Sequence, residues 1–101
     1  MKPRKRKIAT SRYDSADYLK TDADIVAYLK ACLEEGSDNA AYMAHALGVA
    51  ARAYGMLRLA KETGLAREAL YRALSASGNP SLTTITKVLK ALGIKLAVKA
   101  A

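Results

Sequence analysis

Five polar residues near position 70 are spaced so that one face of a helix can carry them all. If Leu70 and Leu74 are buried, that face turns outward from a helix over 66–76. Arg bonds two acceptors on guanine, Glu accepts from the amino group of cytosine, and Tyr meets a thymine methyl group or a phosphate. The spacing therefore predicts a base-contacting surface, called the reading face below. It consists of Arg67, Glu68, Tyr71, Arg72 and Ser75.

A tight turn must orient that helix, and Gly64 is the residue suited to it. A short turn between two crossing helices needs a residue that tolerates a positive φ. Ala60 leaves room at the crossing four residues earlier, and Leu65 follows the turn. The pattern predicts a helix-turn-helix over 56–76, with helices at 56–63 and 66–76. A corner between two helices without any role in DNA binding shows the same pattern, so this alternative stays open.

Phosphate contacts are expected beside the reading face, because most protein–DNA hydrogen bonds go to the backbone. Basic side chains and free N–H groups in the loop after residue 76 supply the candidates. The simpler interpretation is a solvated helix face, on which Glu68 pairs with Arg72 one turn away. The candidates are Arg58, Lys61, Ser77, Asn79 and Lys87, with Lys90 as a further basic residue.

Charge divides the 101 residues into three parts. Residues 1–12 carry six Lys or Arg and no acid, which predicts a flexible basic arm. Residues 13–51 carry two Lys against seven acids, a net −5, and residues 52–101 carry nine Lys or Arg against two acids, a net +7. The basic half suits a polyanion and the acidic segment suits a basic protein, unless both are merely solvated helix faces. For the arm, minor-groove binding, phosphate contact and a disordered tail all stay open.

The remaining pattern predicts helices within a single domain, residues 13–101. Acidic helices fill 13–54, the helix-turn-helix follows over 56–76, and a last helix and a strand occupy 82–99. Gly48 lowers helix propensity by about 1 kcal/mol, which either a close helix approach or a local kink explains. The inner face of the last helix is predicted to begin at Leu82. Expected caps and stops are Asp14, Thr21, Gly36, Ser37 or Asp38, Gly55, Ser81 and Gly93.

The C-terminal residues 94–99 alternate between apolar and polar, which is typical of a short β-strand. The chain offers no partner strand, and a lone strand leaves its backbone groups unpaired. The segment must therefore pair with another copy or another protein, or stay extended in water. Ile94, Leu96 and Val98 are the first candidates for a dimer contact, and the last helix is the alternative.

Several classes of protein do not fit this composition. No apolar run approaches the ~20 residues of a membrane span, and none follows the basic start as in a signal peptide. The single cysteine, Cys32, excludes an internal disulfide, fits the cytoplasm, and is expected in the core. His45 lacks neighbours at metal-ligand spacing and is expected on a helix surface. Without a phosphate loop, nucleophile motif or paired carboxylates, we expect no enzyme, cofactor or small-molecule substrate.

The string GLAREALYRALSASGNPSL, followed by VLKALG, resembles the DNA-binding domain of Xre/HigA-type antitoxins, and especially the addiction-module antidote proteins. The earlier YDSADYLKTDADIVAYLKACLEEG is similar to the N-terminal part of that family, so the resemblance covers about residues 13–96. It implies an all-α, lambda-repressor-like helix-turn-helix domain of five or so helices, to which the strand pattern adds a short C-terminal β-strand. By position, base contacts fall on Arg67, Glu68 and Arg72, with Tyr71 beside them.

In such families the protein is a dimeric repressor of its own operon and neutralises a small basic toxin of the RelE/ParE superfamily. We therefore expect a type II antitoxin: a cytoplasmic homodimer that binds operator DNA and a toxin, and no membrane. A free-standing Xre-type regulator without a toxin is the alternative, and a protein-interaction module that no longer binds DNA is a third. Candidates for toxin contact, each also expected to be core or half-buried, are Tyr13, Tyr18, Tyr28 and Tyr42.

Overall fold

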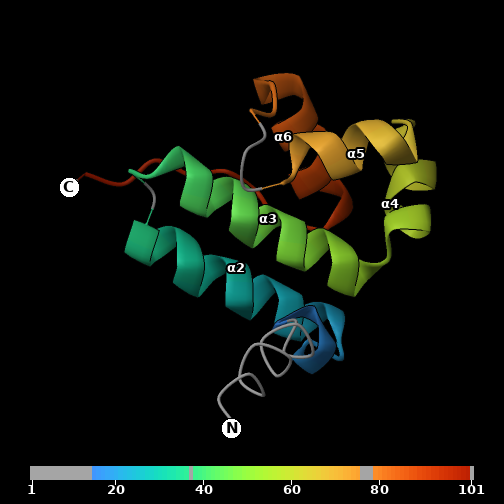
Figure 1. Ribbon diagram of the computed structural model, residues 1–101. Coiled ribbons are helices and arrows are strands. Elements are labelled where there is room, and N and C mark those ends of the chain that lie inside the picture. The colour runs from blue at the N-terminus through green and yellow to red at the C-terminus, as the bar shows by residue number, and fades with distance from the viewer. Residues whose placement is uncertain (1–14, 37, 76–78, 101) are drawn as a thin grey trace, which may run out of the picture.

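The computed structural model describes residues 15–36, 38–75 and 79–100, and these form helices joined by short turns (Figure 1). The described part confirms the all-helical class. A 3-10 turn, η1, comes first, and five α-helices follow it. In chain order the elements are η1 (Ser15–Tyr18), α2 (Asp22–Gly36), α3 (Ala40–Tyr54), α4 (Met56–Thr63), α5 (Arg67–Ala73) and α6 (Leu82–Ala91).

The start of α2 is stabilised by a reciprocal cap. The hydroxyl of Thr21 accepts from the N–H of Asp24, at 3.1 Å, and the carboxylate of Asp24 accepts from the N–H of Thr21, at 3.1 Å. This is a capping box, which satisfies N–H groups that a helix start leaves unpaired. Thr21 is therefore confirmed as the N-cap. Asp14, predicted to cap the preceding short helix, lies outside the described residues.

The cap of α3 differs from the prediction. Asn39, with φ −117° and ψ 106°, is the N-cap, and its side-chain oxygen accepts from the N–H of Tyr42 at 3.0 Å. The prediction of Asp38 is wrong because α3 starts one residue later than expected, and Ser37 lies outside the described residues. Asn caps a helix as well as Asp does, so the cap could move along this polar run without loss.

Helix α3 is the central element of the fold. In Figure 1, α2 lies along one side of α3 and runs antiparallel to it, while α5 and α6 lie on the other side. Burial agrees with this position, because Ala46, Leu47, Gly48, Val49, Ala50 and Ala51 are all buried. A helix buried around most of its circumference needs small residues, and the alanines of α3 supply them. The largest fully buried side chains of the core are Leu29, Leu47, Leu59, Leu70, Val49 and Val88.

Gly48 marks the closest approach in this packing. A Cβ atom at this position would lie 2.4 Å from the backbone carbonyl oxygen of Leu74, at the end of α5. Of the two explanations for the glycine, close helix approach is therefore supported, since the space that a side chain needs is filled by backbone. This contact sets how deeply the C-terminal end of α5 rests on α3.

The last helix is capped as predicted at both ends. The hydroxyl of Ser81 accepts from the N–H of Thr84 at 3.1 Å. At the other end, Gly93 has φ 77°, its N–H donates to Lys90, and the N–H of Ile94 donates to Leu89. These two bonds form a Schellman motif. Leu82 corrects the prediction of a buried start, because it is 71% exposed.

The predicted C-terminal strand is absent from the described structure. Residues 94–100 form neither helix nor strand, and Ile94 alone of its three apolar positions packs against the core. The physical reason is that no second strand is present among the described residues, so the backbone of this segment has nothing to pair with. The strand part of the fold prediction is thus wrong for the single chain.

Gly48→Ala should lower the free energy of unfolding by about 1–3 kcal/mol, because the added methyl group forces the backbone of Leu74 to move. In an open helix the same change is stabilising by about 1 kcal/mol. The matched control is therefore Ala27→Gly at an exposed position of α2, where we expect the glycine variant to be less stable than the parent. Chemical denaturation of the three proteins measures both effects. A Gly48→Ala protein more stable than the parent would contradict the close approach.

Candidate nucleic-acid interface

Helices α4 and α5 are joined by a turn of the kind predicted. Gly64 adopts the left-handed conformation, with φ 75° and ψ 10°, and its N–H donates to Ala60 at 2.9 Å. Leu59 before the turn and Leu70 after it are completely buried, and both belong to the common core. The helix pair is therefore held on both sides of the turn by the same apolar cluster.

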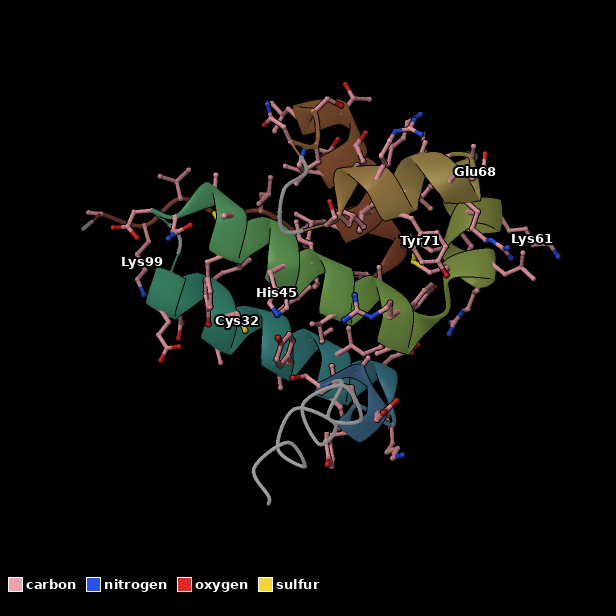
Figure 2. The ribbon with its side chains drawn as sticks, in the orientation of Figure 1. Cys32, His45, Lys61, Glu68, Tyr71 and Lys99 are labelled. Atoms are coloured by element: carbon pink, nitrogen blue, oxygen red, sulfur yellow. The ribbon has the colours of Figure 1, made fainter. Side chains whose placement is uncertain are left out.

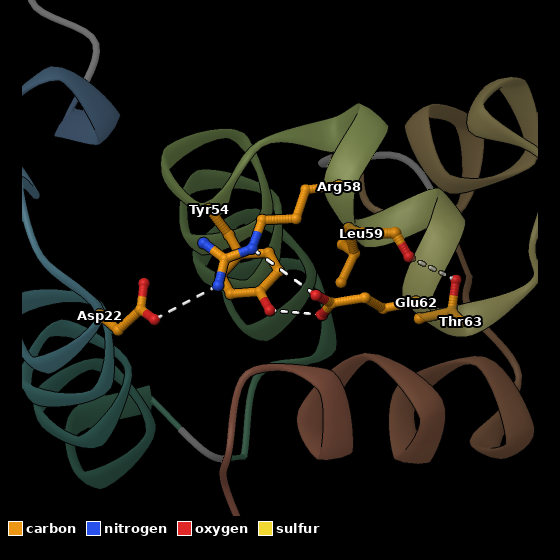
Figure 3. A network of polar contacts seen from close by, with 6 residues as sticks. All are labelled: Asp22, Tyr54, Arg58, Leu59, Glu62 and Thr63. Carbon is orange, nitrogen blue, oxygen red and sulfur yellow. Dashed lines mark hydrogen bonds and ion pairs between the residues drawn. The ribbon is translucent and has the colours of Figure 1, made fainter.

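Thr63 shapes this turn, and the sequence reasoning missed it. Its hydroxyl donates to the carbonyl oxygen of Leu59 at 2.8 Å and accepts from the N–H of Leu65 at 3.2 Å. The side chain thus bonds to one carbonyl group of α4, as Figure 3 shows, and to one N–H group beyond the glycine. The available signal was a threonine directly before the turn glycine, since hydroxyl side chains compete for local backbone groups.

All five residues of the reading face are exposed in the structure. Leu70 and Leu74 are buried behind them, as the spacing predicted, and Tyr71 is 52% exposed. Figure 2 shows Glu68 and Tyr71 on α5 at the same side of the molecule as Lys61 on α4. Within the described residues, no ion pair joins Glu68 to Arg72. The two side chains are therefore not occupied with each other.

Helix α5 is shorter than predicted. It covers Arg67–Ala73 rather than 66–76, with Leu74 as its C-cap, and residues 76–78 lie outside the description. Ser75 follows the helix, and its hydroxyl donates to the carbonyl oxygen of Arg72 at 3.1 Å. At the other end, Ala66 is the N-cap and supplies no side-chain cap. Among the described residues, no side chain caps the first N–H groups of α5.

The candidate phosphate contacts fall into three groups. Lys61, Asn79 and Lys87 are exposed, as is Lys90, whereas Ser77 lies outside the described residues. Asn79 shares an open hollow with two residues of the reading face, between α5 and the start of α6. The residues lining this hollow are Ala69, Arg72, Ala73, Ser75, Asn79, Pro80, Ser81 and Thr84. Arg58 forms the third group by itself.

Arg58 lies at the centre of a polar network at the junction of three helices (Figure 3). Its guanidinium carbon is 3.8 Å from the centre of the Tyr54 ring, in a cation–π contact. It pairs with Asp22 at 3.5 Å and with Glu62 at 3.6 Å, and Glu62 also accepts from the hydroxyl of Tyr54. Asp22 starts α2, Tyr54 ends α3, and the other two residues lie on α4. We call these four residues the Arg58 network.

The Arg58 network gives its arginine a structural task. Two carboxylates face one guanidinium, so the positive charge of Arg58 is compensated within the protein. A phosphate contact by Arg58 would have to compete with both. The hydrogen bond to Glu62, followed by burial, raises the pKa of the Tyr54 phenol.

The acidic segment, residues 13–51 and called the acidic half below, presents a separate surface around α2 in its described part. Tyr18 is 62% exposed and Val26 is 37% exposed, whereas Tyr28 and Tyr42 are half-buried in the seam between α2 and α3. Burial, followed by a hydrogen bond to Cys32, raises the pKa of Tyr28 to about 12. For Tyr42 the hydrogen bond to Cys32 is the larger cause and burial the second, and together they raise its pKa to about 12. Cys32 is buried, as predicted. Tyr13 lies outside the described residues.

The described part of the chain holds no group of three or more potential metal ligands, and His45 is exposed on α3 as expected. None of the helices described is both long enough and apolar enough to span a bilayer.

The described residues form an all-helical domain in which an exposed polar helix, α5, follows a left-handed glycine turn. A family model described as "Probable addiction module antidote protein" matches residues 9–100. The chain therefore belongs to this family. It is also similar to an uncharacterized protein of Haemophilus influenzae, 41% identical over 87 residues that cover 86% of this chain and 88% of the relative. No solved structure matches it significantly.

Glu62→Gln should lower the pKa of Tyr54, because it removes the carboxylate that opposes ionisation of the phenol. A raised pKa in the folded state stabilises the fold below pH 10, and this contribution is lost as the pH rises through the folded-state pKa. Because the folded-state pKa of Tyr54 is lower in the variant, the stabilising contribution of Tyr54 should be lost over a lower range of pH. NMR titration of the Tyr54 ring measures the shift, and Glu34→Gln on exposed α2 is the control. An unchanged Tyr54 titration would contradict the contact.

Proposed function

We propose that the chain is the antitoxin of a type II toxin–antitoxin module and represses its own operon. In this proposal it acts in the cytoplasm as an Xre-type, lambda-repressor-like DNA-binding protein. The observation that carries the DNA-binding part is the reading face: four exposed polar side chains on α5 and Ser75 just beyond its end, with the helix oriented by the Gly64 turn and anchored by Leu70. The family to which the chain belongs supports the antidote part.

The proposed DNA complex places α5 in the major groove. Arg67 and Arg72 would contact guanine, Glu68 cytosine, and Tyr71 a thymine methyl group or a phosphate. Lys61, Asn79 and Lys87 lie on neighbouring elements and would hold phosphates, which fixes the position of the helix without selecting sequence. Arg58 is a weaker candidate, because both of its carboxylate partners would have to be displaced. A homodimer on two half-sites would double this contact.

The proposed toxin site lies on the acidic half. A small basic toxin of the RelE/ParE superfamily would be attracted by the acids of residues 13–51, and charge complementarity of this kind mainly raises the association rate and selectivity. Tyr18 is the most exposed of the described tyrosines in the acidic half, at 62%, whereas Tyr28 and Tyr42 are half-buried. In Figure 1, α2 and α5 lie on opposite sides of α3, which supports separate sites for toxin and DNA.

A free-standing Xre-type regulator is the second candidate function. It would use the same reading face, and the exposed residues of α5 are equally compatible with it. The two candidates differ in whether a small basic protein, encoded by the adjacent reading frame, binds the acidic half.

Arg67→Ala and Arg72→Ala should each weaken binding to the operator by about 1–3 kcal/mol and relax the base preference at one position. The probe is the DNA directly upstream of the chain's own gene, titrated at several salt concentrations. Lys30→Ala is the matched control, because it removes the same charge from α2. If both arginine variants keep parental affinity and selectivity at equal salt, α5 is not the recognition helix.

Tyr18→Ser should weaken binding of the adjacent-frame protein by about tenfold and leave operator affinity unchanged. Tyr71→Ser is the reciprocal control, with weaker operator binding and parental toxin binding. Calorimetric titration and growth rescue on co-expression measure the toxin contact. The absence of any complex with the parental chain would favour the free-standing regulator.

A further inference from the structure

The hollow between α5 and α6 brings together polar side chains from both helices, which lie next to each other in Figure 1. Arg72 lines it from α5, and Ser81 and Thr84 line it from the start of α6. Asn79, two residues before the N-cap of α6, lines it between them. The rest of the described lining consists of one further serine, two alanines and a proline. No carboxylate is therefore among the described residues that line this hollow.

Three donor groups in the hollow are not used by other described residues. The Thr84 hydroxyl accepts from the hydroxyl of Ser81 at 3.1 Å, so its own hydrogen is left to donate. The guanidinium of Arg72 and the side-chain amide of Asn79 form no hydrogen bond or ion pair with a described residue. Together the three groups direct one positive charge and several N–H and O–H donors toward the same open space.

We propose that this hollow binds one phosphate group, with Arg72, Asn79 and Thr84 as its donors. Charge-assisted hydrogen bonds from a guanidinium require an anion, and no acid in the described lining opposes one. A phosphate carries acceptor oxygens in several directions, which suits donors that come from two helices and the segment between them. The DNA backbone as the source of this phosphate rests on the proposed function, whereas binding of free phosphate would not require it.

Arg72 lies at the edge of the reading face, and this position favours a phosphate as its partner. Arg67 is the first residue of α5 and Arg72 is five residues further on, so the two side chains leave the helix about 140° apart. A recognition helix contacts bases mainly through its N-terminal residues. Arg72 is near the other end, on the side of α6, where the DNA backbone would pass. Because a guanidinium has five N–H donors, Arg72 can hold this phosphate and still contact a base.

Thr84 is the residue that this inference adds to the interface. It lies on α6, outside the reading face, and its side chain is half-buried beside the N-cap serine. A phosphate held by both Arg72 and Thr84 would bind to α5 and α6 at once. Such a contact adds affinity and fixes the position of α5 on the DNA, but it does not select sequence.

Titration of the full chain with inorganic phosphate, at constant ionic strength, tests the site without DNA. We expect saturable NMR shifts at the backbone amides of Asn79 and Thr84 and at the side-chain Nε of Arg72. Thr84→Val should weaken phosphate binding by about threefold to tenfold, because it removes one donor. Thr84→Ser keeps the hydroxyl and should retain binding. Thr83→Val is the matched control, since Thr83 is exposed on the same turn but does not line the hollow.

The same variants, titrated with operator DNA and with DNA of unrelated sequence, identify the source of the phosphate. If the source is a DNA backbone, Thr84→Val should weaken binding to both DNAs by about threefold to tenfold, with Thr84→Ser and Thr83→Val at parental affinity. Weaker phosphate binding with unchanged DNA binding would assign the hollow to free phosphate.

The phosphate titration decides whether the site exists. The absence of saturable shifts, or shifts that Thr84→Val leaves unchanged, would overturn the site even if DNA binding weakened, because that loss would then be structural. Saturable phosphate binding by a parental chain that does not bind its operator would reject the DNA-binding function alone.

Discussion

The close contact between α3 and the end of α5 is the constraint on which the arrangement of this molecule depends. Because Gly48 carries no side chain, the backbone of Leu74 can rest directly on α3. Leu70 and Leu74 then point into the core, and the opposite side of α5 must face outward. The outward position of the reading face therefore follows from the burial of Leu70 and Leu74 on the other side of this segment. A bulkier residue at position 48 would disturb both the core and the orientation of that face.

Short sequence patterns predicted most helix ends correctly. They could not predict contacts between residues that lie far apart in the sequence. Thr21, Ser81 and Gly93 act through neighbours three or four residues away, so the chain alone specifies their hydrogen bonds. Asn39 was missed because three adjacent residues can cap equally well, and the packing of α3 chooses among them. The exposure of Leu82 has a similar cause, since helical spacing does not say where the buried face begins.

In the candidate site, too, the features set by nearby residues were predicted and those set by distant contacts were not. Helical spacing correctly placed the reading face outside and Leu70 inside, because that inference needs only the period of a helix. It could not show that Arg58 faces Asp22, a residue 36 positions earlier, since only the folded chain brings α2 beside α4. It could not remove the C-terminal strand either. Alternation describes how a segment would behave in a sheet, and a sheet also needs a partner.

The Arg58 network has a consequence for how the two proposed binding surfaces relate. It joins the start of α2, on the acidic half, to α4, the helix that precedes the Gly64 turn (Figure 3). Asp22 and Glu62 are 65% and 44% exposed, so solvent and a basic partner can reach both carboxylates. The two proposed binding surfaces therefore lie on parts of the chain that one solvent-accessible ion-pair network holds together.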